Sequence, residues 1–141
     1  MLRVVVDPGV LVAALISPRG TPAQLLLRWR DGEFDVVVSS ALLDELERVL
    51  KRPKFSRYVT PAEAAAYWRM LREAGVMYED PLPQPGLTPD PGDDYLVALS
   101  RAAGAAVLVS GDAHLTELTD PEPPVLTPRE FLDRLESTPG G

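Results

Sequence analysis

The chain contains no cysteine and only one histidine, His114. Disulfide bonds and thiolate metal ligands are therefore excluded, and a zinc centre built from the usual nitrogen and sulfur ligands is nearly excluded as well. We expect any metal ion that this protein binds to be held by oxygen atoms.

Long apolar runs are also missing. The sequence has no run of about 18 apolar residues that could span a membrane. It also has no basic leader followed by an apolar segment and a cleavage site. We therefore expect a cytoplasmic protein without membrane contact.

Positive charge is scarce, with 14 lysines and arginines against 21 aspartates and glutamates and a formal net charge of -7. This balance excludes a protein that coats nucleic acid through its overall field, although nucleic acid can still be a substrate. Five cations nevertheless lie close together: Arg48, Lys51, Arg52, Lys54 and Arg57. They are candidates for RNA contacts, but the solvated end of a helix is the slightly favoured interpretation.

What the sequence does contain is an alternation of short apolar strands and helices over 141 residues, of which 45% are apolar. This length predicts one domain with a single core, over residues 1–136, followed by a flexible tail at 137–141. Strands are predicted at 4–6, 34–38, 76–78, 105–109 and 123–126. Helices are predicted at 10–16, 21–30, 40–50, 60–74, 92–103, 113–118 and 128–136.

Three of these helices begin with the same pattern of residues, Thr-Pro followed by Glu or Gln, at 21–24, 60–63 and 127–130. The pattern predicts a capping box with proline at the first helical position. Between residues 80 and 91 the chain has five prolines and one glycine. This composition indicates an extended connection over the surface. Its length and position suggest that it runs along the edge of a site.

Acidic side chains follow two of the predicted strands. Strands that alternate with helices form a parallel sheet with helices on both faces, and their carboxyl ends meet at one edge. We therefore expect Asp7 and Asp112 to lie together, although Asp7 taken alone favours the interpretation as a helix N-cap. Asp94 begins the helix before the fourth strand. Glu45 and Glu47 border the apolar stripe of helix 40–50, where the pattern alone favours ordinary boundary residues.

Carboxylates that converge in this way do not stabilise a fold. Like charges within about 4 to 6 Å raise one another's pKa, so the group is tolerable only when it is neutralised. A divalent cation with oxygen ligands does this most simply, and Mg²⁺ or Mn²⁺ is the expected ion.

Four segments resemble the four acidic motifs of the PIN domain: the strand ending in Asp7, Ser40–Leu46, Asp93–Leu99 and Leu108–Asp112. The resemblance covers nearly the whole chain, and it depends on the order and spacing of the motifs. PIN domains are metal-dependent ribonucleases, and many are toxins of bacterial and archaeal toxin-antitoxin pairs. The resemblance therefore implies hydrolysis of RNA with one or two Mg²⁺ or Mn²⁺ ions, a cognate antitoxin, and a homo-oligomer of two or more copies.

Carried over residue by residue, the resemblance implies four metal-binding carboxylates: Asp7, Glu45, Asp94 and Asp112. It thereby selects Glu45 over Glu47. Asp93 is an alternate or supporting acid, and Ser110 stands where a hydroxyl usually supports the site. Gly9 departs from the family pattern, which has asparagine there. This departure leaves open a catalytically weakened module that acts through protein or RNA binding.

Three other classes of protein compete with this interpretation. A haloacid-dehalogenase-like phosphatase would need a second aspartate where Gly9 stands, so we discount it. A receiver-like domain would need a phosphoacceptor aspartate after the third strand and a late lysine, and neither is evident. In a non-catalytic module the acids would be helix caps only. His114 is interpreted as a surface or cap residue.

Overall fold

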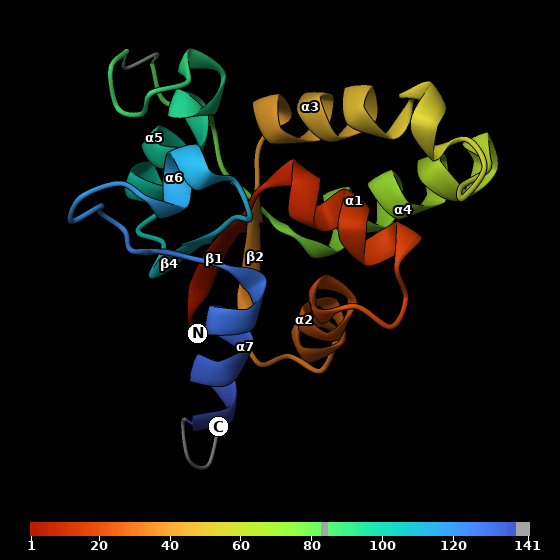
Figure 1. The fold of residues 1–141 in the computed structure, drawn as a ribbon, viewed down its shortest axis with the longest axis horizontal. Helices are drawn as coiled ribbons and strands as arrows, with labels where there is room; N and C mark the ends of the chain where they lie inside the picture. The colour runs from red at the N-terminus through yellow and green to blue at the C-terminus, as the bar shows by residue number, and fades with distance from the viewer. Residues whose placement is uncertain (83–84, 138–141) are drawn as a thin grey trace.

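The first strand, β1 (Arg3–Val6), lies at the centre of the sheet. The computed structural model describes residues 1–82 and 85–137 (Figure 1). Within these residues, five strands pair in the order β3-β2-β1-β4-β5, and every pairing is parallel. Figure 1 shows α5 and α6 on one side of the sheet and α1 and α4 on the other. The predicted α/β fold with a central parallel sheet is therefore confirmed.

Valines build the middle of this sheet. The other strands are β2 (Asp35–Val38), β3 (Val76–Met77), β4 (Val107–Val109) and β5 (Val125–Leu126). Val5, Val37 and Leu108 are 0% exposed, as expected for strands that are covered on both faces. The edge strands β3 and β5 are only two residues each, which limits the exposed row of unpaired backbone groups.

Helices fill the connections between the strands. They are α1 (Pro8–Ile16), α2 (Thr21–Arg30), α3 (Ser40–Leu50), α4 (Pro61–Ala74), α5 (Asp94–Ala102), α6 (Ala113–Thr116) and α7 (Pro128–Ser137). Short 3-10 helices, η1 (Pro53–Phe55) and η2 (Pro91–Asp93), precede α4 and α5. Among the described residues no single helix is long and apolar enough to cross a membrane; only α1 and α2 taken together, a pair bent by 97°, reach that length and composition.

Two of the three predicted capping boxes form. Thr60 and Glu63 exchange side-chain and backbone hydrogen bonds at the start of α4, and Thr127 and Glu130 do the same at α7. The prediction is wrong at Thr21, which already belongs to α2. Gly20 takes the N-cap position there without a side-chain bond, and the Thr21 hydroxyl accepts a hydrogen bond from Arg129 instead.

The predicted loop (80–91) and the predicted tail (137–141) agree closely with the structure, as far as it describes these residues. The connection from residue 80 has neither helix nor strand until η2 begins at Pro91, with residues 83–84 outside the described part. Ser137, predicted as the first residue of the tail, ends α7. Residues 138–141 lie outside the described residues, so the flexible tail stays a prediction.

Candidate metal centre

The pairing of β1 with β4 brings together two segments that lie about a hundred residues apart in the chain. Val6 is in register with Val109, and the Asp7 N–H donates a hydrogen bond of 2.9 Å to the Val109 carbonyl oxygen. Asp7 and Ser110, the residues that follow these strands, are therefore neighbours at the carboxyl edge of the sheet.

The Ser110 hydroxyl joins Asp7 to Asp112. Its Oγ donates to Asp7 Oδ2 at 2.8 Å and accepts from the Asp112 N–H at 3.0 Å. Ser110 is 0% exposed, so the hydroxyl is held in this position by the core. The structure thus places Ser110 as the support of two acids.

Asp7 and Asp112 are also helix caps. Asp7 Oδ1 accepts from the Gly9 N–H at the start of α1, at 2.9 Å. Asp112 Oδ1 accepts from the His114 N–H at the start of α6, at 2.8 Å. The cap interpretation and the site interpretation therefore describe the same side chains, because each carboxylate has one oxygen turned to a helix start.

Asp93 completes a group of three carboxyl groups with Asp7 and Asp112. Burial, and after it the negative charges of Asp112, Asp7 and Asp90, together raise the pKa of Asp93 to about 7. Burial also raises the pKa of Asp7, against the hydrogen bonds from Gly9 and Ser110. Asp93 Oδ2 is buried and has no hydrogen-bond partner among the described residues. The group is therefore short of positive charge and of donors.

Asp94, predicted from the sequence as the metal ligand of this segment, has a different environment. Its carboxylate accepts hydrogen bonds from the N–H and hydroxyl of Thr88, at 2.7 and 2.8 Å, and from the Gly86 N–H at 3.1 Å. Only 6% of Asp94 is exposed. Both carboxylate oxygens thus hold the 86–88 loop, and it is the adjacent Asp93 that lies with Asp7 and Asp112.

Glu45, the fourth predicted ligand, lies on α3 and forms an ion pair with Arg48. The side chain of Glu45 is 26% exposed. Arg48 in turn lies near the start of α5, where its charge opposes a rise in the pKa of Tyr95 that is caused by burial and then by Asp7, Asp93 and Asp80. The structure therefore pairs the Glu45 carboxylate with a cation near the acidic group.

Two further residues that we did not select from the sequence belong to this neighbourhood. One ligand atom from each of Asp90, Asp93 and His114 lies within 4.8 Å of the other two, a spacing that could hold a metal ion. The signal was the turn Asp90-Pro91-Gly92-Asp93, which returns the chain on itself. His114 is indeed a surface residue, with a side chain 60% exposed, but it also faces this acidic group.

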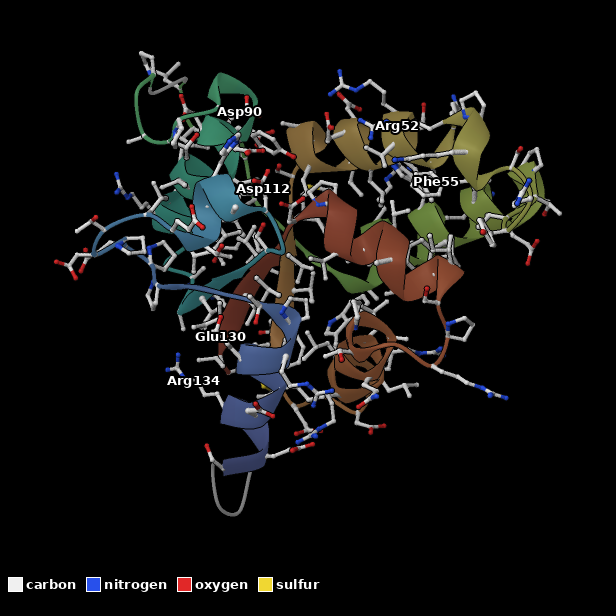
Figure 2. All side chains as sticks on the ribbon, viewed as in Figure 1. Arg52, Phe55, Asp90, Asp112, Glu130 and Arg134 are labelled. Atoms are coloured by element: carbon white, nitrogen blue, oxygen red, sulfur yellow. The ribbon has the colours of Figure 1, made fainter. Side chains whose placement is uncertain are left out.

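Arg48 is the predicted RNA-contacting cation that lies near the acidic group, and the others lie elsewhere. Lys51 forms an ion pair of 3.2 Å with Glu47, and Lys54 Nζ lies 5.1 Å from the centre of the Phe55 ring. Figure 2 shows Arg52 and Phe55 at the end of α3 far from Asp90 and Asp112. The structure does not bring Lys51, Arg52 and Lys54 of this segment to the acidic group.

The residues at the sheet edge fit a divalent cation. Their ligand atoms are mostly carboxylate oxygens, which suit hard cations such as Mg²⁺ and Mn²⁺. The charge of a cation would also oppose the rise in the pKa values of Asp7 and Asp93, and the ion would occupy the unpartnered Asp93 oxygen.

Comparisons with known proteins agree with this geometry. Residues 3–114 match the PIN domain family, which confirms the resemblance predicted from the motifs. No curated protein sequence matches significantly. The fold is similar to PAE2754 from Pyrobaculum aerophilum, with a TM-score of 0.67 and 18% identity over 97% of this chain and 91% of that one. It is also similar to VapBC2 from Rickettsia felis, solved bound to a DNA fragment from their promoter, with a TM-score of 0.64 and 13% identity over 89% and 98% of the two chains.

Proposed function

Because the chain belongs to the PIN domain family, we propose that it is a divalent-metal-dependent endoribonuclease that hydrolyses phosphodiester bonds in single-stranded or looped RNA. One observation carries the proposal. Three carboxyl groups from distant parts of the chain, those of Asp7, Asp93 and Asp112, gather at the carboxyl edge of the sheet, where they repel one another.

These three aspartates would hold Mg²⁺ or Mn²⁺, with Glu45 as a fourth acid close by. When bound, the ions would supply an activated water and neutralise charge on the phosphate and the leaving 3′ oxygen. Ser110 orients Asp7 by its hydrogen bond to Oδ2. Asp90 and His114 lie beside Asp93 and add two possible ligands to the group. None of the acids attacks the phosphate.

The cellular role that we propose is that of a toxin in a toxin-antitoxin pair, in the cytoplasm, with RNA as substrate and a cognate antitoxin as partner. The family resemblance and the similarity to VapBC2, which is a complex solved on its promoter DNA, support this role. We also propose that the protein forms a homodimer or a larger homo-oligomer.

A catalytically weakened binding module is the second candidate, and Gly9 favours it. A Cβ added at Gly9 would lie 3.5 Å from Asp7 Oδ1. A side chain at this position would therefore stand beside the carboxylate and could orient it or a water, and glycine provides no such group.

Cleavage of a labelled RNA pool in Mn²⁺, Mg²⁺ or EDTA tests the proposal, with Asp93→Asn and Asp94→Asn as a matched pair. We expect Asp93→Asn to lower the rate at least about 100-fold, since even indirect partners of a metal site cost 10- to 100-fold. Asp94→Asn should keep most of the activity at a temperature where it is folded, because its carboxylate holds the loop. Equal activity of wild type and Asp93→Asn would disprove the assignment.

The same assay separates the two candidates. If the wild type binds Mn²⁺ but cleaves no RNA, while Gly9→Asn does cleave, the protein is the weakened module. If the wild type cleaves and EDTA stops it, the module is excluded.

A further inference from the structure

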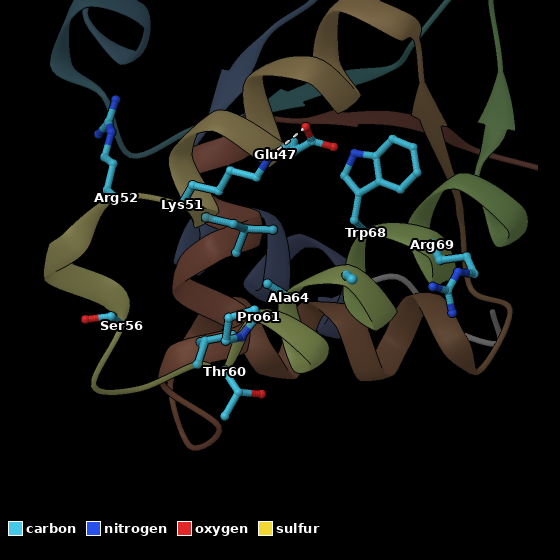
Figure 3. A pocket seen from close by; sticks show the side chains of 12 residues that line it. Glu47, Lys51, Arg52, Ser56, Thr60, Pro61, Ala64, Trp68 and Arg69 are labelled. Atoms are coloured by element: carbon cyan, nitrogen blue, oxygen red, sulfur yellow. Dashed lines mark hydrogen bonds and ion pairs between the residues drawn. The ribbon is translucent and has the colours of Figure 1, made fainter.

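A groove lies at the end of α3 that is far from the acidic group. It is formed by the last turn of α3, residues of the segment 52–60 and α4 from Pro61 to Arg69, and its volume is about 540 Å³. This is within the range of about 300 to 1,000 Å³ that is usual for binding pockets. Figure 3 shows it open toward the viewer, with Lys51 and Arg52 on one side and Trp68 and Arg69 on the other.

The inside of the groove is apolar and firmly supported. Leu50 and Val59 are 7% and 8% exposed, and Ala64 and Ala65 line the side formed by α4. Trp68 is fixed as a wall, because its indole N–H donates to the Leu43 carbonyl oxygen at 2.8 Å. The polar atom of the indole is thus satisfied inside the protein, which leaves an apolar ring edge toward the groove.

The rim of the groove is basic on a protein that is acidic overall. Residues 48–57 contain five cations and no acid, whereas the whole chain carries a net charge of -7. Lys51 is paired with Glu47. Within the described part of the chain, Arg52 and Arg69 have no ion pair. Both arginines line the groove, so their charges can attract an anionic group that enters it.

We infer that this groove binds a segment of a partner protein in which apolar side chains are flanked by aspartates or glutamates. The apolar lining accounts for the first feature, and the unpaired arginines of the rim account for the second. An acidic segment would be repelled by most of this protein and attracted here, so the charge pattern would also select the orientation of the partner.

A nucleic acid fits the same groove less well. The rim could meet phosphates, but the bases would enter a largely apolar lining, in which the hydroxyls of Ser56 and Thr60 are among the few groups that could bond to their edges. The guanidinium of Arg72 lies 5.7 Å from the centre of the Trp68 ring and covers part of the surface on which a base would stack. The inference does not depend on the metal centre, because the two sites lie at opposite ends of α3.

Binding of fluorescent synthetic peptides to the full chain tests the inference. The peptides are helix-forming, about 16 residues long, with leucines spaced i, i+4 and i+7 and flanking positions that are all Glu, all Gln or all Lys. We expect the Glu peptide to bind at least fivefold tighter than the Gln peptide, and the Lys peptide to bind most weakly. The preference should shrink as salt is raised.

Two pairs of variants locate the binding. Ala65→Phe fills the groove and should weaken the Glu peptide at least tenfold, whereas Ala62→Phe, at an exposed alanine of α4 outside the lining, should change it less than twofold. Arg69→Glu should abolish the preference for the Glu peptide, whereas Arg30→Glu at the end of α2 should not. Thermal melting verifies that each variant is folded.

Three results would overturn the inference. The first is equal affinity of the wild type for all three peptides, or equal affinity of Ala65→Phe and the wild type for the Glu peptide. The second is tighter binding of a short single-stranded RNA that is lost in both Ala65→Phe and Arg69→Glu, which would make the groove a nucleic-acid site. The third is conversion of a dimer to a monomer by Ala65→Phe alone, which would make a second copy of this chain the occupant.

Discussion

Two adjacent aspartates, Asp93 and Asp94, have different surroundings, and the motif resemblance selects Asp94 as the ligand with Asp93 as the alternate. The chain leaves η2 at Asp93 and enters α5 at Asp94, so their side chains diverge by about a third of a helical turn. One reaches the acidic group at the sheet edge, and the other reaches the 86–88 loop. The spacing of the motifs narrows the expected acid to one of these two residues. Only the backbone path of the turn decides which of the two side chains faces the acidic group.

The raised pKa of Asp93 predicts how the stability of the metal-free protein depends on pH. The pKa is about 7 in the folded protein against an ordinary value of 3.8, so the folded protein binds a proton more tightly than the unfolded chain. Its contribution to stability therefore falls as pH rises from about 4 to about 7. In EDTA, lowering the pH from 8 to 5.5 should raise the melting temperature of the wild type by about 2 to 5 °C more than that of Asp93→Asn.

Asp93→Asn itself supplies the control for this titration. At pH 8 it should melt at a higher temperature than the wild type in EDTA, because it removes one of three repelling charges. Parallel pH profiles of the two proteins, measured by circular dichroism, would mean that Asp93 is not the titrating group.

The starts of three helices show where a local sequence pattern predicts a cap correctly and where it does not. Thr21, Thr60 and Thr127 stand in the same Thr-Pro-x-Glu/Gln context, yet only the last two form capping boxes. At Thr21 the preceding Gly20 is extended and takes the cap position, while the hydroxyl bonds to Arg129 of α7. Packing of α2 against α7 thus decides a helix boundary that the pattern places one residue later.

Thr60→Ala should lower the free energy of unfolding by about 1 kcal/mol, because the cap hydroxyl bonds to the Glu63 N–H of α4. Thr21→Ala, in the same sequence pattern, should change it by less than about 0.5 kcal/mol, as a surface substitution without a cap does. Urea titrations of the two variants measure the difference. Equal losses would contradict the capping assignments.

Gly75 ends α4 for a steric reason. A Cβ on Gly75 would lie 2.7 Å from the Leu71 carbonyl oxygen and 2.9 Å from both Cγ atoms of Val38. Gly75→Ala should therefore lower the free energy of unfolding by about 1 to 3 kcal/mol, the usual cost of overpacking. Gly111→Ala is the matched control, because nothing lies within 4 Å of its Cβ. Urea unfolding should show little change for it; equal losses would mean that the α4–β2 contact relaxes freely.

For the whole molecule, α3 separates two surfaces of opposite charge. Its N-terminal end lies nearer the acidic group, Glu45 pairs with Arg48 farther along the helix, and its last turn borders the basic groove. Figure 2 shows these surfaces at the two ends of the helix, with Asp112 near one end and Arg52 near the other. A protein with net charge -7 thus carries both signs in separate places.

Metal should stabilise the whole domain, because the ion binds the assembled acids and not the unfolded chain. At a Mn²⁺ concentration 100 times the dissociation constant, the gain is about 2.7 kcal/mol. The melting temperature of the wild type should therefore rise in Mn²⁺ and return in EDTA. Asp112→Asn should show a much smaller rise, whereas Asp44→Asn, at an exposed acid of α3, should respond like the wild type. A wild type indifferent to Mn²⁺ would contradict a metal centre.

The sequence by itself determined the alternation of strands and helices, the parallel sheet and the convergence of Asp7 and Asp112. These follow from apolar periodicity and from the rule that parallel strands end at one edge, and both are properties of the chain order.

Only the tertiary structure decided which acids meet and where the cations lie. The choice of Asp93 over Asp94, the pairing of Glu45 with Arg48 and the approach of Asp90 to His114 depend on side-chain directions set by turns and packing. The basic segment ends α3 in a groove and not at the acidic edge, because the length of α3 carries it away. These are contacts between elements, and no local pattern encodes them.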